Sequence, residues 1–208
     1  MANKTIASNL LQINAIKLNP ANPFTWASGW KSPIYCDNRK TLSFPDVRNA
    51  VCYGFVELIK RKYPDVEIIA GVATGAIAHG MLVADRMQLP FIYVRSAPKS
   101  HGLTNQIEGD YKPGQKVVVI EDLISTGMSS LAAVEALKNA GCNVLGLVAI
   151  FTYQFNQATE GFANAGVEFE TLSNYTELIG IAMESGYVKP EQLELLNSWR
   201  ENPEAWGK

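Results

Sequence analysis

Residues 117–130 read VVVIEDLISTGMSS. Four apolar residues are followed by two acids, Glu121 and Asp122, and then by small and hydroxylated residues. A continuous apolar run without alternating polar positions is typical of a strand buried on both faces of a parallel sheet. The stretch therefore predicts a buried strand that delivers two carboxylates at its end. A hydroxyl-rich turn then leads into a helix that starts near Met128 or Ser129.

The segments on either side of this strand alternate between strands and helices. We expect strands at 67–72, 90–95, 116–122, 143–151 and 167–172, and helices near 4–17, 45–62, 74–87, 129–141, 155–165, 174–185 and 190–200. Apolar strands separated by helices indicate an α/β fold whose central, mostly parallel sheet is covered on both faces. Residues 24–42 are rich in aromatic residues, Ser, Gly and Pro, and predict irregular structure with short strands.

The bulk composition restricts the function classes. The chain has 208 residues, of which 47% are hydrophobic, and no composition break marks a linker, so we expect one domain over 1–208. The net charge of -2 argues against a protein that coats nucleic acid or a membrane, because such a protein would need an excess of basic residues. No stretch approaches the ~20 apolar residues of a membrane span, and the N-terminus lacks the apolar block of a signal peptide. We therefore expect a soluble cytoplasmic protein, with three reduced cysteines rather than a zinc site.

In a parallel sheet, ligands bind beyond the C-terminal ends of the strands. The turn after Asp122 can hold a phosphate on the amides of the following helix, with Ser125, Thr126 and Ser129 as further donors. Gly127 allows close approach of the backbone. Carboxylates would repel a phosphate but can accept hydrogen bonds from vicinal hydroxyls. The stretch predicts a ribose 5-phosphate site; the alternative is a solvated strand end followed by an ordinary helix cap.

Two other loops between predicted elements contain residues that could bind an anion. The small-residue loop in GVATGAIAHG (71–80) can direct several amides at an anion, or can be a tight strand–helix contact in which His79 is structural. The polar connection VRSAPKSHGLTNQIEGDYKPG (94–114) exceeds the ~12–15 residues usual for loops. Its cations Arg95, Lys99 and His101 could neutralise a charged leaving group. The alternative is a charged surface loop with no role.

The opening stretch resembles the phosphoribosyl pyrophosphate (PRPP) motif of type I phosphoribosyltransferases. The resemblance implies their α/β fold with a small N-terminal hood segment, here about 1–42. It implies that Glu121 and Asp122 hold the ribose hydroxyls and that the 71–80 loop grips the pyrophosphate. The PRPP-binding residues would be Glu121, Asp122, Ser125, Thr126, Gly127, Met128, Ser129, Ala73 and Thr74. PRPP synthetases and PRPP-binding regulators share this motif.

Two further segments resemble orotate phosphoribosyltransferases specifically. The pattern V-R-x-x-x-K-x-H-G…I-E-G is similar to their catalytic loop, which implies that Arg95, Lys99 and His101 contact the pyrophosphate. Residues 24–39, FTWASGWKSPIYCDNR, resemble their orotate-side segment. The implied orotate-binding residues are Phe24, Trp26, Lys31, Arg39 and Thr126.

The chain also departs from some members of this family. Ser96 follows the loop arginine where some members have Lys, and Ala27 stands where some have another Lys. Some have an Arg after the strand that here ends in FTYQFNQ, and no Arg occurs between Arg95 and Arg200. The carboxylate of orotate must then be met by backbone amides, Lys31 or Arg39.

The resemblance implies transfer of the phosphoribosyl group of PRPP to orotate, giving orotidine 5'-phosphate and pyrophosphate in de novo pyrimidine (UMP) biosynthesis. Mg²⁺ would be held mainly through PRPP and pyrophosphate, with no protein ligand. The enzyme would be a homodimer whose 95–112 loop acts across the interface. Two alternatives stay open: a purine or uracil phosphoribosyltransferase, against which the 24–39 segment argues, and a PRPP-sensing regulator, against which the Lys99/His101 loop argues.

Overall fold

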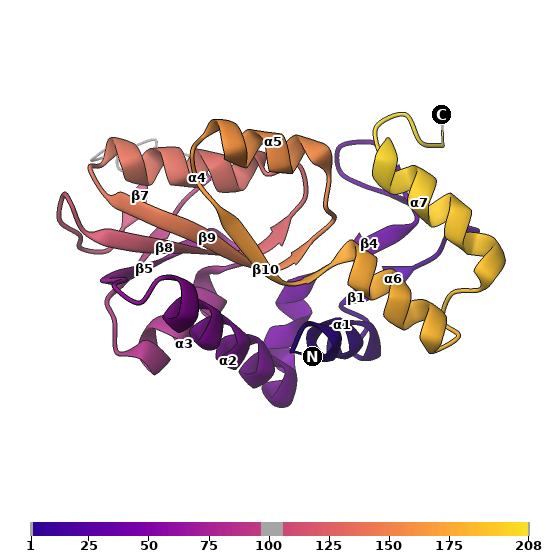
Figure 1. Ribbon diagram of the computed structural model, residues 1–208, viewed down its shortest axis with the longest axis horizontal. Helices are drawn as coiled ribbons and strands as arrows, with labels where there is room; N and C mark the ends of the chain where they lie inside the picture. The colour runs from indigo at the N-terminus through magenta and orange to yellow at the C-terminus, as the bar shows by residue number, and fades with distance from the viewer. Residues whose placement is uncertain (1, 97–105, 208) are drawn as a thin grey trace.

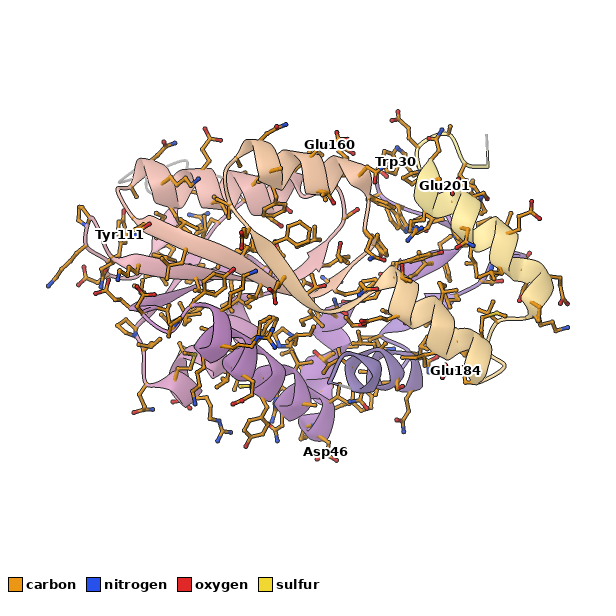
Figure 2. All side chains as sticks on the ribbon, in the orientation of Figure 1. Trp30, Asp46, Tyr111, Glu160, Glu184 and Glu201 are labelled. Carbon is orange, nitrogen blue, oxygen red and sulfur yellow. The ribbon has the colours of Figure 1, made fainter. Side chains whose placement is uncertain are left out.

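A computed structural model describes residues 2–96 and 106–207 of the chain. A six-stranded sheet lies between two layers of helices, and both ends of the chain gather beside one end of this sheet (Figure 1). The labelled charged side chains Asp46, Glu160, Glu184 and Glu201 are exposed and point outward, while other side chains fill the space between sheet and helices (Figure 2).

The sheet has the strand order β10-β9-β8-β5-β6-β7. Five of its strands run parallel, namely β5 (Ile68–Val72), β6 (Phe91–Val94), β8 (Lys116–Ile124), β9 (Asn143–Thr152) and β10 (Phe169–Asn174). The edge strand β7 (Ile107–Glu108) pairs antiparallel with β6 and was not predicted, because two residues carry no periodicity. The predicted α/β class with a mostly parallel sheet is confirmed.

Helices cover both faces of this sheet. Helices α2 (Pro45–Lys62) and α3 (Ile77–Met87) lie on one face, and α4 (Met128–Asn139) and α5 (Asn156–Asn164) lie on the other (Figure 1). Helix α2 has the predicted bounds, with Pro45 in its first turn and three basic residues in its last. Helix α3 starts three residues later than predicted, because residues 74–76 belong to the loop that follows β5.

The N-terminal segment forms small antiparallel sheets. Strand β1 (Ile16–Leu18) pairs with β4 (Ile34–Cys36), β2 (Phe24–Thr25) pairs with β3 (Lys31–Ser32), and a 3-10 helix η1 (Asn38–Ser43) follows. The short strands predicted within 24–42 are confirmed. The predicted extension of the first helix to residue 17 is wrong: α1 (Ala2–Gln12) ends earlier, and Asn14 turns the chain with a φ of 54°.

The C-terminal helices pack against this N-terminal segment. Helix α6 (Tyr175–Glu184) is capped by Asn174, as predicted, and the 3-10 helix η2 (Pro190–Gln192) leads into α7 (Leu193–Glu201). Trp199 of α7 is fully buried. Its ring centroid lies within 5.7 Å of the ring centroids of Trp26, Tyr153, Phe155 and Tyr175. No helix within the described residues is long and apolar enough to span a membrane.

Candidate active site

A cleft of about 500 Å³ opens at the C-terminal ends of β5 and β8. From β5 the chain continues outward to β6, whereas from β8 it continues in the opposite direction to β9 and β10. Such a switch point is where open α/β sheets bind their ligands. The cleft is lined by Cys36, Asp37, Arg39, Val72, Ala73, Thr74, Gly75, Glu121, Asp122, Leu123, Ser125 and Ser129.

The two predicted acids lie inside strand β8 rather than after its end. Strand β8 continues to Ile124, and its pairing with β9 extends that far. Its pairing with β5, however, ends at Gly71 opposite Ile120. Glu121 and Asp122 therefore occupy the part of β8 that extends beyond the end of β5, and both residues line the cleft.

Glu121 is held by hydrogen bonds from within the protein. Only 4% of the residue is exposed, and its two carboxylate oxygens accept hydrogen bonds from the Asp122 amide and the Ser130 hydroxyl, each at 2.9 Å. Burial, together with the neighbouring charge of Asp122, raises the pKa of Glu121 well above its usual value. Burial also raises the pKa of Asp122. Asp122 is the more accessible of the two and is the carboxylate best placed to meet a ligand.

The loop after β5 lies directly against Asp122. The loop contains Ala73, Thr74 and Gly75, and its Ala73–Thr74 peptide bond is cis. A Cβ atom at Gly75 would overlap the carboxylate of Asp122, so a larger residue here would force that carboxylate or the loop to move. The cleft thus brings the predicted ribose-binding acid and the predicted pyrophosphate loop into contact.

The predicted phosphate turn forms the next wall of the cleft. Gly127 has a φ of 83°, which favours glycine, and helix α4 begins at the following residue as predicted. Ser125 and Ser129 line the cleft, whereas Thr126, Gly127 and Met128 are not among its described lining residues. The first amides of a helix have no partner within it, so this turn presents donors at the cleft.

The hood segment supplies the remaining wall. Arg39 makes two bonds to Asp37, with Nε 2.7 Å from Oδ1 and Nη2 3.1 Å from Oδ2. This hydrogen-bonded guanidinium lowers the pKa of Asp37. Asp37 and Cys36 were not among the predicted site residues, although both lie in the 24–39 segment that resembles the orotate-side segment.

Four of the five residues predicted to hold orotate are not among the described residues that line this cleft, namely Phe24, Trp26, Lys31 and Thr126. Phe24 packs on the Tyr35 ring at 5.8 Å, and the Lys31 ammonium donates to the Thr25 hydroxyl. Trp26 donates from Nε1 to the Ile34 carbonyl at 3.1 Å and stacks on Tyr153. Arg39 is the basic residue of this segment that the fold brings to the cleft.

The predicted catalytic loop is described only at its ends. The Arg95 amide donates to the Gln106 carbonyl at 2.9 Å, and the Arg95 guanidinium lies 3.6 Å from the Glu108 carboxylate. Arg95 is not one of the described cleft-lining residues. Lys99 and His101 lie outside the described residues, and their predicted role stays a prediction.

The buried His79 should make the stability of the fold pH-dependent. It lies on α3 with 1% of its surface exposed, and burial lowers its pKa from 6.5 to about 4. Protonation therefore favours the unfolded chain, so stability should fall as the pH drops from about 6.5 to about 4, by about 3 kcal/mol. Denaturant unfolding of the wild type and of His79→Gln at pH 7.5 and 4.5 measures this. The wild type should lose more stability than the variant, and equal losses would contradict the assignment.

Comparison with known proteins identifies the family. Residues 55–169 match the model of the phosphoribosyl transferase domain. The chain is 58% identical to the orotate phosphoribosyltransferase of Porphyromonas gingivalis over 204 residues, which cover 98% of this chain and 97% of that protein. It is also 58% identical to the orotate phosphoribosyltransferase of Streptococcus pneumoniae over 203 residues, covering 98% and 97% of the two chains.

Solved structures agree. The orotate phosphoribosyltransferase of Aeropyrum pernix superimposes with a TM-score of 0.76 at 27% identity, covering 88% of this chain and 99% of that chain. Leishmania donovani UMP synthase gives a TM-score of 0.80 at 27% identity, covering 96% of this chain but only 42% of that longer chain. The chain therefore belongs to the phosphoribosyltransferase family, and within it to the orotate phosphoribosyltransferases.

Proposed function

We propose that this protein transfers the phosphoribosyl group of PRPP to orotate, forming orotidine 5'-phosphate and releasing pyrophosphate in de novo pyrimidine synthesis. One observation carries the proposal. A single cleft joins the carboxylate of Asp122 to two loops suited to anions, Ala73–Gly75 on one side and Ser125–Ser129 on the other. PRPP has the matching order of groups, with a diphosphate and a 5-phosphate on either side of a vicinal diol.

The roles of the residues follow from charge. The 5-phosphate lies on the amides and hydroxyls of Ser125–Ser129, where the N-terminus of α4 favours negative charge. The ribose diol donates to Asp122, and Glu121 is the buried partner that orients it. The pyrophosphate lies on Ala73 and Thr74. The protein supplies position and electrostatics rather than a covalent nucleophile.

This arrangement requires a cation. The carboxylate of Asp122 abuts Gly75, in the loop proposed to hold the pyrophosphate. Two anionic groups so close repel each other unless a positive charge lies between them. Mg²⁺ meets this need through pyrophosphate and ribose oxygens and water, because it keeps much of its hydration.

Arg39 is the residue we propose for the orotate carboxylate, because it lines the cleft and its guanidinium, bound to Asp37 through Nε and Nη2, has further N–H groups on Nη1 for a second carboxylate. Phe24, Trp26, Lys31 and Thr126 remain further candidates for the orotate side. We further propose a homodimer, in which Arg95, Lys99 and His101 of each 95–112 loop serve the partner's cleft. The whole chain acts as one domain, with the hood as part of it.

Asp122→Asn tests the ribose assignment. Hydrogen bonds to a charged group contribute about 1.5–3 kcal/mol, so PRPP affinity should fall by about 10- to 100-fold. Calorimetric titration with PRPP and Mg²⁺ measures this. Asp46→Asn, an exposed acid on α2, is the matched control and should bind normally. Unchanged affinity in Asp122→Asn would remove this residue from the ribose site.

The reaction itself is tested by following the absorbance of orotate on addition of PRPP and Mg²⁺. Hypoxanthine, adenine and uracil are run in parallel. We expect turnover of orotate alone. Turnover of another base in place of orotate would identify a different phosphoribosyltransferase, and PRPP binding without turnover of any base would identify a regulator.

A further inference from the structure

Three buried polar side chains lie beneath the cleft and have no part in the proposed reaction. Asn38 and Thr41 come from η1, and His79 comes from α3; at most 1% of each residue is exposed. Burying such groups is unfavourable unless they are hydrogen-bonded. Their bonds connect the three residues, through the main-chain carbonyl of Asn38, to the backbone of Asp122.

The available protons determine which group donates in each of these hydrogen bonds. The Thr41 hydroxyl donates its one proton to the main-chain carbonyl of Asn38 at 2.6 Å. Its contact with Nε2 of His79, at 3.2 Å, must therefore be one in which the histidine donates. The amide Nδ2 of Asn38 in turn donates to the Asp122 carbonyl at 2.6 Å. His79 and Thr41 thus hold the main chain at Asn38, and the Asn38 side chain, whose Oδ1 accepts from the Cys36 thiol at 3.3 Å, reaches Asp122.

Asn38 completes the hydrogen bonding of β8 where a neighbouring strand is missing. The pairing of β5 with β8 ends at Gly71 opposite Ile120, whereas the pairing of β8 with β9 continues to Ile124. Beyond Ile120, the side of β8 that faced β5 needs other partners for its backbone. Asn38 supplies one to the Asp122 carbonyl, from a residue 84 positions away in the sequence.

The short segment around Asn38 also lines the cleft. Asp37 and Arg39, on either side of Asn38, both line the cleft. His79 lies on the helix that follows the loop containing Ala73 and Gly75. The bonds therefore link the hood, and helix α3 that follows the loop after β5, to the acidic end of β8.

We propose that Asn38, whose main chain is held by Thr41 and His79, is a positioning residue that fixes the backbone of Asp122 and so holds its carboxylate against the loop at Gly75. This inference rests on the proposed function for the identity of the ligand, PRPP. Asn38 itself touches no reacting atom in this assignment. Its loss should loosen PRPP binding more than it slows the bound complex.

Kinetics and binding test the proposal. Asn38→Ala should weaken PRPP affinity by about tenfold, with kcat changed less than threefold. Thr41→Val, which removes only the hydroxyl, should weaken it about threefold, while Thr41→Ser should stay within twofold of wild type. When Asp122→Asn is already present, adding Asn38→Ala should cause little further loss of PRPP affinity. A purely structural role would lower the thermal midpoint and leave the two mutations additive.

Amide exchange without ligand separates this inference from the proposed function. Asn38→Ala should speed exchange of the 119–126 backbone at least tenfold, whether or not the protein binds PRPP. If wild-type protein fails to bind PRPP, the proposed function is wrong and the exchange result still decides the role of Asn38. Unchanged exchange, or wild-type PRPP affinity in folded Asn38→Ala, would overturn the inference. Should that variant not fold, the Thr41→Val and Thr41→Ser pair decides: equal behaviour overturns it.

Discussion

Gly75→Ala should lower the affinity for PRPP by about 10- to 100-fold. The added methyl group would overlap the carboxylate of Asp122, so either that side chain or the loop after β5 must move. Overpacking of this kind costs about 1–3 kcal/mol, and each 1.4 kcal/mol is a factor of ten in binding. Both groups that would move are proposed to touch PRPP. Calorimetric titration with PRPP and Mg²⁺ gives the affinity, and denaturant unfolding gives the change in stability.

Gly180→Ala is the matched control. Gly180 lies within α6, and a methyl group there would meet nothing within 4 Å. This variant should keep wild-type PRPP affinity and gain about 0.5–1 kcal/mol of stability, because alanine is the better helix former. A Gly75→Ala protein with unchanged PRPP affinity would show that Asp122 and the loop need not keep their contact for binding.

Lys99→Ala should lower turnover by about 100- to 1,000-fold while PRPP affinity changes less than threefold. Removing one preorganised donor from a developing anion has an effect of this size, and pyrophosphate leaves with a high charge. The two described ends of this connection meet: the Gln106 side chain donates to the Arg95 carbonyl at 2.7 Å, and Val94 pairs with Ile107. Single-turnover rates at saturating PRPP and orotate measure the chemical step.

The control for this loss of charge is Lys60→Ala, an exposed lysine in the last turn of α2. It should leave turnover unchanged.

Mixed dimers then test whether the loop acts across the interface. Lys99→Ala and Asp122→Asn subunits are co-expressed in equal amounts and assayed at a PRPP concentration that saturates the wild type but not Asp122→Asn. They should regain roughly a quarter of wild-type activity, because half the dimers are mixed and each holds one intact site. No recovery would mean that each loop serves its own subunit.

The sequence predicts the sheet well because its strands carry their own signal. The run at 117–120 is apolar throughout, and the corresponding part of β8 is fully buried. The structure of the N-terminal region is harder to predict, since β1 has only three residues and follows a helix with similar apolar spacing. The turn at Asn14 that separates them gives no strong local signal.

The candidate site divides in the same way. Glu121, Asp122, Ser125 and Ser129 follow from their place at the end of an apolar run, and all four line the cleft. Asn38 could not be predicted, because its role depends on a carbonyl in a distant strand. Trp26 suited a base-stacking role by sequence, yet its ring packs against Tyr153 and Trp199, a contact made only when the C-terminal helix folds back.

The packing of Trp199 on the hood has a spectroscopic consequence. The four tryptophans of the chain are Trp26, Trp30, Trp199 and Trp206. All belong to the hood or the C-terminal segment, and none lies in the central sheet or in α2–α5. Tryptophan fluorescence therefore reports on the packing of the hood against the C-terminal helices, whereas far-ultraviolet circular dichroism is dominated by the rest of the molecule. Comparing the two signals during unfolding would show, without any label, whether the hood detaches before the sheet melts.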